Sequence, residues 1–147
     1  ISYGDVLFNK YIPQSLCQES DDCVIFLDSN WREETSYARL GGFAECTIPN
    51  SRRAFNAKVY LKQLGNEIPE ANTHGVWMGF LKVSPAAAKL ITDVISEMLA
   101  QPGNRKATIP QLIQELLKRQ QPIRVLYTVG HWLDINSLED VVQAGNF

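Results

Sequence analysis

The sequence predicts an α/β domain built on a largely parallel sheet with helices packed against it. Short apolar runs of strand character alternate along the chain with segments whose apolar residues recur at helical spacing. The chain has 147 residues, of which 45% are hydrophobic and 20% charged, and this composition is typical of a folded domain. No repeat or low-complexity run divides residues 1–147, so we expect a single domain.

The strands are predicted from runs of apolar residues that end at turn signals. Residues 23–27 are continuously apolar and end at Asp28, which fits a strand buried on both faces of a parallel sheet. Residues 57–64 alternate between apolar and polar side chains, as a half-buried strand does. We expect residues 1–3 to end a further strand. We also expect strands at 76–83 and 123–129 to run parallel to the strand at 23–27 in one sheet.

The helices are predicted from apolar spacing and from their capping residues. Ser84 and Pro85 supply an N-cap and a first-turn proline for a helix that ends near Leu99. A second helix starts near Thr108, and a last one follows Asn136, with an acid three positions later. The apolar spacing also predicts a helix over residues 6–17. Residues 30–56 are the least regular, and we expect an excursion or a lid-like segment there.

Charge and cysteine content argue against several classes of protein. Lys and Arg total 14 against 16 for Asp and Glu, a net charge of −2 that does not suit a protein that binds nucleic acid or anionic membranes. No apolar run approaches the roughly 20 residues of a membrane span. The first residues carry no basic region followed by an apolar core, so we expect that they are not a signal peptide. The three cysteines form no C-x-x-C pair, so we expect reduced thiols and a cytoplasmic location.

Three acidic residues lie at or just beyond the ends of predicted strands: Asp5, Asp28 and Asp134. Ligands of open α/β sheets bind beyond these ends, and two converging carboxylates can hold a divalent cation. The alternative is that each acid only caps a turn or a helix. We expect Asp5 and Asp134 to face one crevice, with Cα atoms no more than about 15 Å apart.

Two short motifs carry a resemblance to a known family. Tyr3-Gly4-Asp5-Val6 and Gly130-His131-Trp132-Leu133-Asp134 resemble, in this order, motifs of nucleotidyltransferases of the sugar-nucleotide type. The closest likeness is to the phosphonate and phosphocholine cytidylyltransferases, which occur alone or fused to phosphoenolpyruvate mutases. The resemblance covers almost the whole chain but only the later part of the family domain. Val76 stands where many relatives carry an acid.

The resemblance implies a Rossmann-like (GT-A-type) fold and a Mg²⁺-dependent nucleotidyl transfer. Asp5 and Asp134 would be the catalytic residues and would hold the Mg²⁺ ion. The nucleotide would be a nucleoside triphosphate, and the likeness to the cytidylyltransferases favours CTP. The acceptor would be a small phosphonate or phosphate. The acceptor would attack the α-phosphorus and release pyrophosphate.

One part of the family site has no counterpart in these residues. The nine glycines form no glycine-rich loop that could cradle a triphosphate, and in the family this loop precedes the Gly-Asp strand. We therefore expect the chain to be the C-terminal portion of the domain, inactive alone and prone to form a homo-oligomer through an uncovered sheet edge.

Four further residues are candidates for substrate contact. Lys62 and Lys82 could bind phosphate, or they could be ordinary solvated lysines. Trp77 could stack on a substrate, although its apolar strand favours a place in the core. His131 could contact the substrate or occupy a turn. Two other functions stay open, namely a non-catalytic regulatory or assembly module and a companion domain of a phosphoenolpyruvate mutase.

Overall fold

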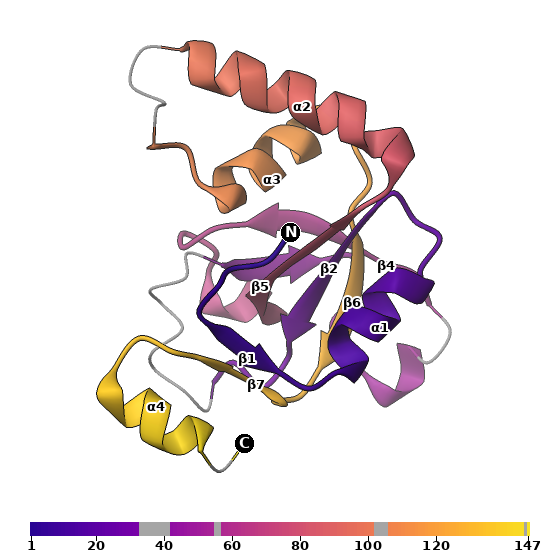
Figure 1. The fold of residues 1–147 in the computed structure, drawn as a ribbon. Helices are drawn as coiled ribbons and strands as arrows, with labels where there is room; N and C mark the ends of the chain where they lie inside the picture. The colour runs from indigo at the N-terminus through magenta and orange to yellow at the C-terminus, as the bar shows by residue number, and fades with distance from the viewer. Residues whose placement is uncertain (33–41, 55–56, 102–105, 146) are drawn as a thin grey trace.

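A computed structural model describes residues 1–32, 42–54, 57–101, 106–145 and 147 (Figure 1). Its strands are β1 (Val6–Phe8), β2 (Cys23–Asp28), β3 (Phe43–Cys46), β4 (Val59–Leu64), β5 (Gly75–Val83), β6 (Arg124–Thr128) and β7 (Trp132–Asp134). Its α-helices are α1 (Tyr11–Gln18), α2 (Pro85–Ala100), α3 (Ile109–Lys118) and α4 (Leu138–Ala144), with short 3₁₀ turns at Arg52–Ala54 and Glu70–Asn72. None of the described helices is long and apolar enough to cross a membrane.

Five strands close into a small barrel in the order β2-β5-β3-β4-β6. Only β2 and β6 run parallel, and the other pairings in the barrel are antiparallel. The α/β class is correct, but the mostly parallel Rossmann-like sheet is wrong: β2, β5 and β6 share a sheet in which β5 runs antiparallel to β2. A continuous apolar run indicates burial on both faces and not the direction of the neighbouring strand.

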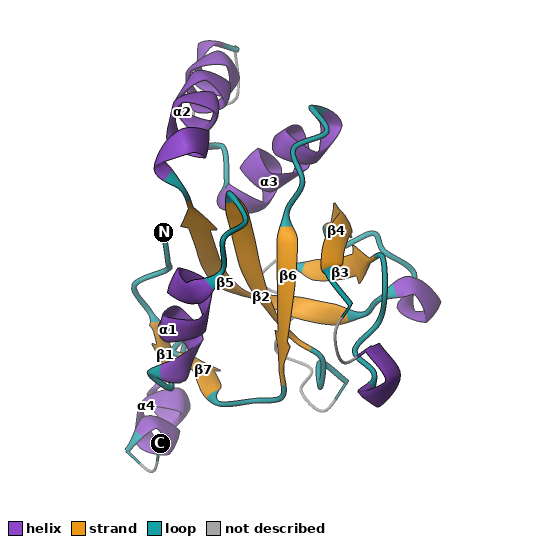
Figure 2. Ribbon diagram, turned by 90° about the vertical axis from the view of Figure 1, so that its right-hand side faces the viewer, coloured by secondary structure: helices purple, strands orange, loops and turns teal. Residues whose placement is uncertain are grey.

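Alternate residues of β2 and β5 belong to two different cores. Ile25, Leu27 and Trp77 face the barrel interior, which packs against α2 and α3. Phe26 and Met78 face the opposite side, where β1, α1 and β7 cover the sheet. Figure 2 shows this arrangement, with α2 and α3 at one end of the barrel and α1, β1, β7 and α4 along its side. Both faces of β2 are therefore buried, and all six of its residues are shielded from solvent.

The predicted helices after residue 84 are confirmed with their caps. The Ser84 side chain accepts a hydrogen bond from Ala87 N (3.2 Å), and Pro85 opens α2. Thr108 and Gln111 form a reciprocal capping box at the start of α3. The cap of α4 is Ser137, one residue later than Asn136, because Asp140 completes its capping box.

The N-terminal segment differs from its prediction. Residues 6–8 form β1, which pairs antiparallel with β7, and the helix begins only at Tyr11. Residues 1–3 form no strand; Ser2 makes a single bridge to Phe80. Asp5 therefore precedes a strand and does not follow one. A three-residue strand is too short for its periodicity to be distinguished from that of the adjoining helix.

The irregular segment predicted at 30–56 contains one strand of the barrel. Residues 43–46 form β3, which pairs with β4 and β5. This part is structural, so the lid-like interpretation is wrong for it. Residues 33–41 and 55–56 of the segment lie outside the described part of the chain.

Candidate functional site

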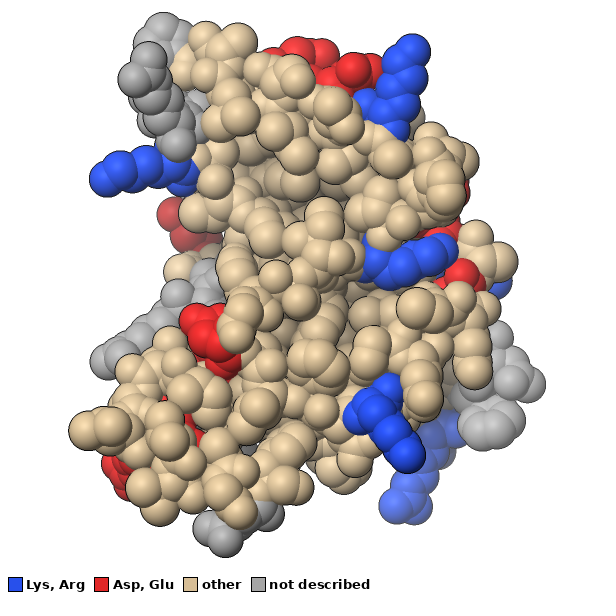
Figure 3. Space-filling view, viewed as in Figure 1, with Lys and Arg blue, Asp and Glu red and all other residues tan. Residues whose placement is uncertain are grey.

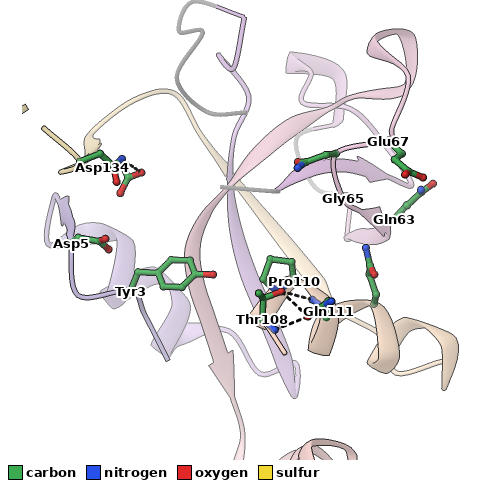
Figure 4. Close-up of a pocket in the computed structure, with 12 residues that line it drawn as sticks. Tyr3, Asp5, Gln63, Gly65, Glu67, Thr108, Pro110, Gln111 and Asp134 are labelled. Atoms are coloured by element: carbon green, nitrogen blue, oxygen red, sulfur yellow. Dashed lines mark hydrogen bonds between the residues drawn. The ribbon is translucent and has the colours of Figure 1, made fainter. Parts of the chain in front are cut away.

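A cavity of about 700 Å³ lies between the β1–β7 pair and the barrel (Figure 4). One wall consists of Tyr3, Asp5, Asp134 and Asn136. The opposite wall consists of the end of β4, the turn at residues 65–67 and the first turns of α3. The two aspartates thus face amide-bearing side chains across an open space.

The pairing of β1 with β7 brings Asp5 and Asp134 together. Val6 lies directly opposite Asp134 in the antiparallel register, and Ile135 N donates a hydrogen bond to Asp5 O (2.8 Å). Opposite Cα atoms lie about 5 Å apart and consecutive ones about 4 Å, so the Cα atoms of Asp5 and Asp134 are within about 9 Å. The expected convergence on one crevice is confirmed, although the acids are 129 positions apart.

The two carboxylates interact electrostatically. Partial burial raises the pKa of Asp134, and the negative charges of Asp5 and Asp140 raise it further, against a hydrogen bond from Asn136 that lowers it. That bond joins Asn136 Nδ2 to Asp134 Oδ2 (2.6 Å). Two acids held together in a cavity whose described lining holds no Lys or Arg form a pair that a divalent ion would stabilise.

The donor set fits Mg²⁺ as part of a coordination shell. Mg²⁺ is commonly bound through one or two carboxylates, with water and substrate phosphates as the other ligands. Among the described residues, no group of three or more His, Cys, Asp or Glu could form a complete metal site. Asp5 and Asp134 therefore suit a cation that arrives with its substrate better than a permanently bound structural ion.

Tyr3 is a component of the site that the sequence analysis did not single out. Its ring packs at 5.6 Å from the Trp77 ring and lies over Gly79, where an added Cβ would come within 2.7 Å of a ring carbon. Burial raises the pKa of Tyr3, and the charges of Asp5 and Asp134 raise it further, so the phenol stays protonated as a hydrogen-bond donor. The sequence signal that could have identified Tyr3 as a site residue is its position two residues before Asp5.

The opposite wall is polar, and the described part of it carries no basic side chain. Gln114 Nε2 donates to Leu64 O (2.6 Å), and Gln111 Oε1 accepts from Thr108 N (2.7 Å). These bonds fix the amides where α3 meets β4. Glu67 is the acidic residue of this wall, and neither Lys nor Arg lines the cavity among the residues that the structure describes. Surface amides of this kind have no distinctive sequence pattern.

The four predicted substrate contacts do not line the cavity. Trp77 is fully buried, and its Nε1 donates to Phe80 O (2.8 Å), so its side chain belongs to the core. Lys82 Nζ donates to the backbone oxygens of Glu19 (3.1 Å) and Asp21 (2.6 Å). Trp77 therefore has the core role that the sequence left open, whereas Lys82 is bound to backbone oxygens and is not an ordinary solvated lysine.

Lys62 and His131 are exposed but engaged elsewhere. Lys62 forms an ion pair with Glu45 (2.9 Å) on the outside of the barrel. His131 occupies a turn with a φ of 64°, and its Nδ1 lies 3.2 Å from the Tyr11 hydroxyl. The structure thus brings together only Asp5 and Asp134 from the predicted site.

Asp28 also lies outside the cavity. Its carboxylate accepts hydrogen bonds from Asn30 N (2.8 Å), Gly130 N (3.2 Å) and Trp132 Nε1 (2.8 Å), and the residue is 2% exposed. The turn-capping alternative is therefore the correct one for this acid.

Comparison with solved structures identifies the fold. A UTP-bound UGPase from Acinetobacter baumannii matches 95% of this chain with a TM-score of 0.63 at 12% identity, over 46% of its own length. A protein described as a glucose-1-phosphate thymidylyltransferase from Bacillus anthracis, solved with sucrose, matches 97% (TM-score 0.60, 16% identity, 51% of its length). An apo UDP-glucose pyrophosphorylase matches 99% (TM-score 0.59, 15% identity, 49% of its length).

The chain has the fold of part of a sugar nucleotidyltransferase. It spans about half the length of the solved structures that it matches. No protein-family model matches the sequence, and no curated protein sequence does. At this level of identity the likeness concerns the fold, and the cytidylyltransferase branch inferred from the motifs stays a proposal.

Proposed function

We propose that this chain supplies the metal- and acceptor-binding part of a nucleotidyltransferase site, at the cavity between the β1–β7 pair and the barrel. The observation that carries the proposal is the convergence of Asp5 and Asp134 at this cavity, in a fold shared with sugar nucleotidyltransferases. One of those structures holds UTP. The nucleotide proposed here is a nucleoside triphosphate, with CTP favoured by the Gly-His-Trp-Leu-Asp motif at residues 130–134.

The charge of the cavity favours an acceptor that carries an ammonium group beside its phosphate or phosphonate. Its described lining includes Asp5, Glu67 and Asp134 and no basic side chain. Figure 3 shows that the lobe over α4 and the β1–β7 pair, at lower left, exposes acidic but no basic side chains on this face, and residues 125–147 contain no Lys or Arg. A phosphocholine-like or aminoalkyl phosphonate acceptor would place its cationic end against Glu67, because Asp5 and Asp134 are assigned to the Mg²⁺ ion.

In the proposed reaction an acceptor oxygen forms a bond to the α-phosphorus, while the bond between the α-phosphorus and the bridging oxygen of the leaving pyrophosphate breaks. Asp5 and Asp134 would hold Mg²⁺, which when bound supplies positive charge beside the phosphates. The protonated Tyr3 hydroxyl would donate a hydrogen bond to a substrate oxygen. Gln111 and Gln114, fixed by their own hydrogen bonds, would shape the acceptor side.

The experiment follows pyrophosphate release from CTP, UTP and dTTP with phosphocholine, an aminoalkyl phosphonate or glucose 1-phosphate as acceptor. We expect no release from the 147-residue chain alone, because removing one aligned phosphate donor typically costs a factor of about 10² to 10³ and these residues hold no glycine-rich loop. We expect release with CTP and an ammonium-bearing acceptor once a glycine-rich phosphate-binding segment is joined before Ile1.

Matched variants make this result interpretable. Asp134→Asn in the active protein should remove most of the turnover, whereas Asp21→Asn, in the turn before β2, should leave it unchanged. Asp21 pairs with Lys58 (3.2 Å) and does not line the cavity. Normal turnover by Asp134→Asn would contradict the proposed site. No nucleotide binding in any form would favour the alternative of a non-catalytic module.

A further inference from the structure

Asp28 connects the barrel to the segment that carries Asp134. One carboxylate oxygen, Oδ2, accepts from both Gly130 N (3.2 Å) and Trp132 Nε1 (2.8 Å), while Oδ1 accepts from Asn30 N (2.8 Å). The carboxylate is buried at the end of β2, which is itself held on both sides by β5 and β6. Two residues of the 130–132 turn are thus fixed to the most enclosed strand of the molecule.

The turn needs this support because its backbone conformation is unusual. Gly130 and His131 both have positive φ angles, 63° and 64°, and the left-handed region is unfavourable for a residue with a side chain. On its outer side the turn is held by Tyr11, whose hydroxyl contacts His131 Nδ1, and by Asn9 N, which donates to His131 O (3.0 Å). The strand that follows, β7, has three residues and pairs only with β1 among the described strands.

The position of Asp134 therefore depends on two supports, the register with β1 and the anchoring of Trp132. Trp132 is buried in the core on the outer side of the sheet, and Asp134 lies two residues further along the same short strand. A displacement of Trp132 would move Asp134 relative to Asp5. An amide cannot replace the carboxylate fully, because all three of its partners are N–H donors and one end of an amide is itself a donor.

We propose that Asp28 is a positioning residue whose buried carboxylate holds the 130–132 turn so that Asp134 faces Asp5 and the two acids can bind a divalent cation. Only the part of this proposal that concerns the cation rests on the proposed function. The placement of Asp134 by Asp28 is a separate statement about the folded chain. Asp28 lies outside the cavity and would contact neither the cation nor the substrate.

The first measurement is the affinity for Mn²⁺ of the 147-residue chain, by calorimetric titration, in the wild type and three variants. Asp28→Asn should weaken binding by about 10- to 100-fold, the usual loss when a group that orients a metal ligand is removed. Trp132→Phe, which deletes one donor to Asp28 and keeps a buried ring, should give a smaller loss. Asp21→Asn, in the turn before β2, should bind within twofold of the wild type.

The second measurement is amide hydrogen exchange at residues 132–134 relative to the amides of β2. We expect Asp28→Asn and Trp132→Phe to accelerate exchange at 132–134 by at least tenfold more than in β2, and Asp21→Asn to show no such difference. If Asp28→Asn fails to fold, both measurements are made on Trp132→Phe, and its results decide the proposal.

The two measurements separate the two proposals. No Mn²⁺ binding by the wild type, with selective exchange at 132–134 in the variants, would contradict the metal site and support the positioning role. Unchanged Mn²⁺ affinity and unchanged relative exchange in both Asp28→Asn and Trp132→Phe would overturn the positioning role, since a residue that only contributes to stability lowers the melting temperature without moving either quantity.

Discussion

The cavity lies between two regions that are held together in different ways. The barrel with α2 and α3 encloses a continuous apolar core, and residues such as Ile25 and Trp77 have no exposed surface. The β1–β7 pair with α4 has few buried side chains: α4 buries none, and Leu138 and Val142 are 86% and 72% exposed. A two-stranded sheet is marginally stable alone, so this region depends on its contacts with the barrel.

Among the described residues, the β1–β7 pair meets the barrel through the core on the outer side of the sheet, where Val6 and Trp132 are buried, and through specific pairs. Phe8 packs edge-to-face on Phe80 with ring centroids 4.7 Å apart, and Trp132 binds Asp28. The weakly packed region provides the wall with the paired aspartates, while the tightly packed region provides a mostly amide-lined wall in which Glu67 is the charged residue. Changes in stability and changes in the site should therefore separate by region, which the following substitutions test.

The largest effect on stability is expected from a core residue of the barrel. Trp77→Ala should lower the free energy of unfolding by about 3–5 kcal/mol, because it leaves a large cavity among residues that cannot close it. Val142→Ala on α4 should change it by no more than about 0.5 kcal/mol. Urea denaturation measures both free energies. Comparable losses would show that α4 packs against the rest of the protein, contrary to its exposed side chains.

A pair of glycine substitutions compares the two regions at positions where φ is positive. Gly79 in β5 and Gly130 before β7 both have positive φ angles, 83° and 63°, but an added Cβ meets Tyr3 only at Gly79. Gly130→Ala should cost about 1–2 kcal/mol for the backbone alone. Gly79→Ala should cost about 1–3 kcal/mol more, because the Tyr3 ring must move.

The readout for this pair is the free energy of unfolding by urea, together with the fluorescence of Trp77 beside Tyr3. Equal losses for the two variants would mean that Tyr3 does not rest on Gly79 in solution.

Two capping boxes provide a smaller comparison. Thr108→Ala should lower the free energy of unfolding by about 1 kcal/mol, because α3 is part of the barrel core. Ser137→Ala should have little effect on global unfolding, because α4 can fray while the barrel stays folded. Circular dichroism and urea denaturation together distinguish loss of helix from loss of stability. A full 1 kcal/mol effect at Ser137 would show that α4 unfolds cooperatively with the barrel.

The smallest expected effect concerns the dependence of stability on pH. The pKa of Asp134 is raised in the folded chain, so its contribution favours the folded state below the ordinary aspartate pKa and is lost as the pH rises through the raised value. Asp134→Asn should remove this loss, which is small because the carboxyl is largely solvated. Relative to the wild type, the variant should gain stability as the pH rises from about 3 to 7, measured by thermal denaturation. A relative loss over that range would contradict the coupling with Asp5.

The sequence predicted those features that depend on neighbouring residues. The helices that follow Ser84 and Thr108 are confirmed because capping side chains and first-turn prolines act locally. The meeting of Asp5 and Asp134 was predicted from motif order. Strand direction, the strand at residues 6–8 and the role of Asp28 were not, because each depends on pairing with residues about 50 to 130 positions away.

Tyr3 was missed for a related reason. Its place in the cavity depends on the absence of a side chain at Gly79, on a different strand. Lys62 and Lys82 were proposed as phosphate contacts from their strand positions, but the charge of a lysine does not show which groups its ammonium binds. Lys82 is bound by backbone oxygens of the loop before β2, and Lys62 by Glu45.

The most direct test of the proposed site is to locate bound Mn²⁺ by paramagnetic broadening of amide signals in the ¹⁵N-labelled chain. We expect selective broadening of the amides of Tyr3, Asp5, Asp134 and Asn136 at substoichiometric Mn²⁺. That broadening should be lost in Asp134→Asn but not in Asp21→Asn. Broadening centred on any other group of residues, or unchanged broadening in Asp134→Asn, would contradict it.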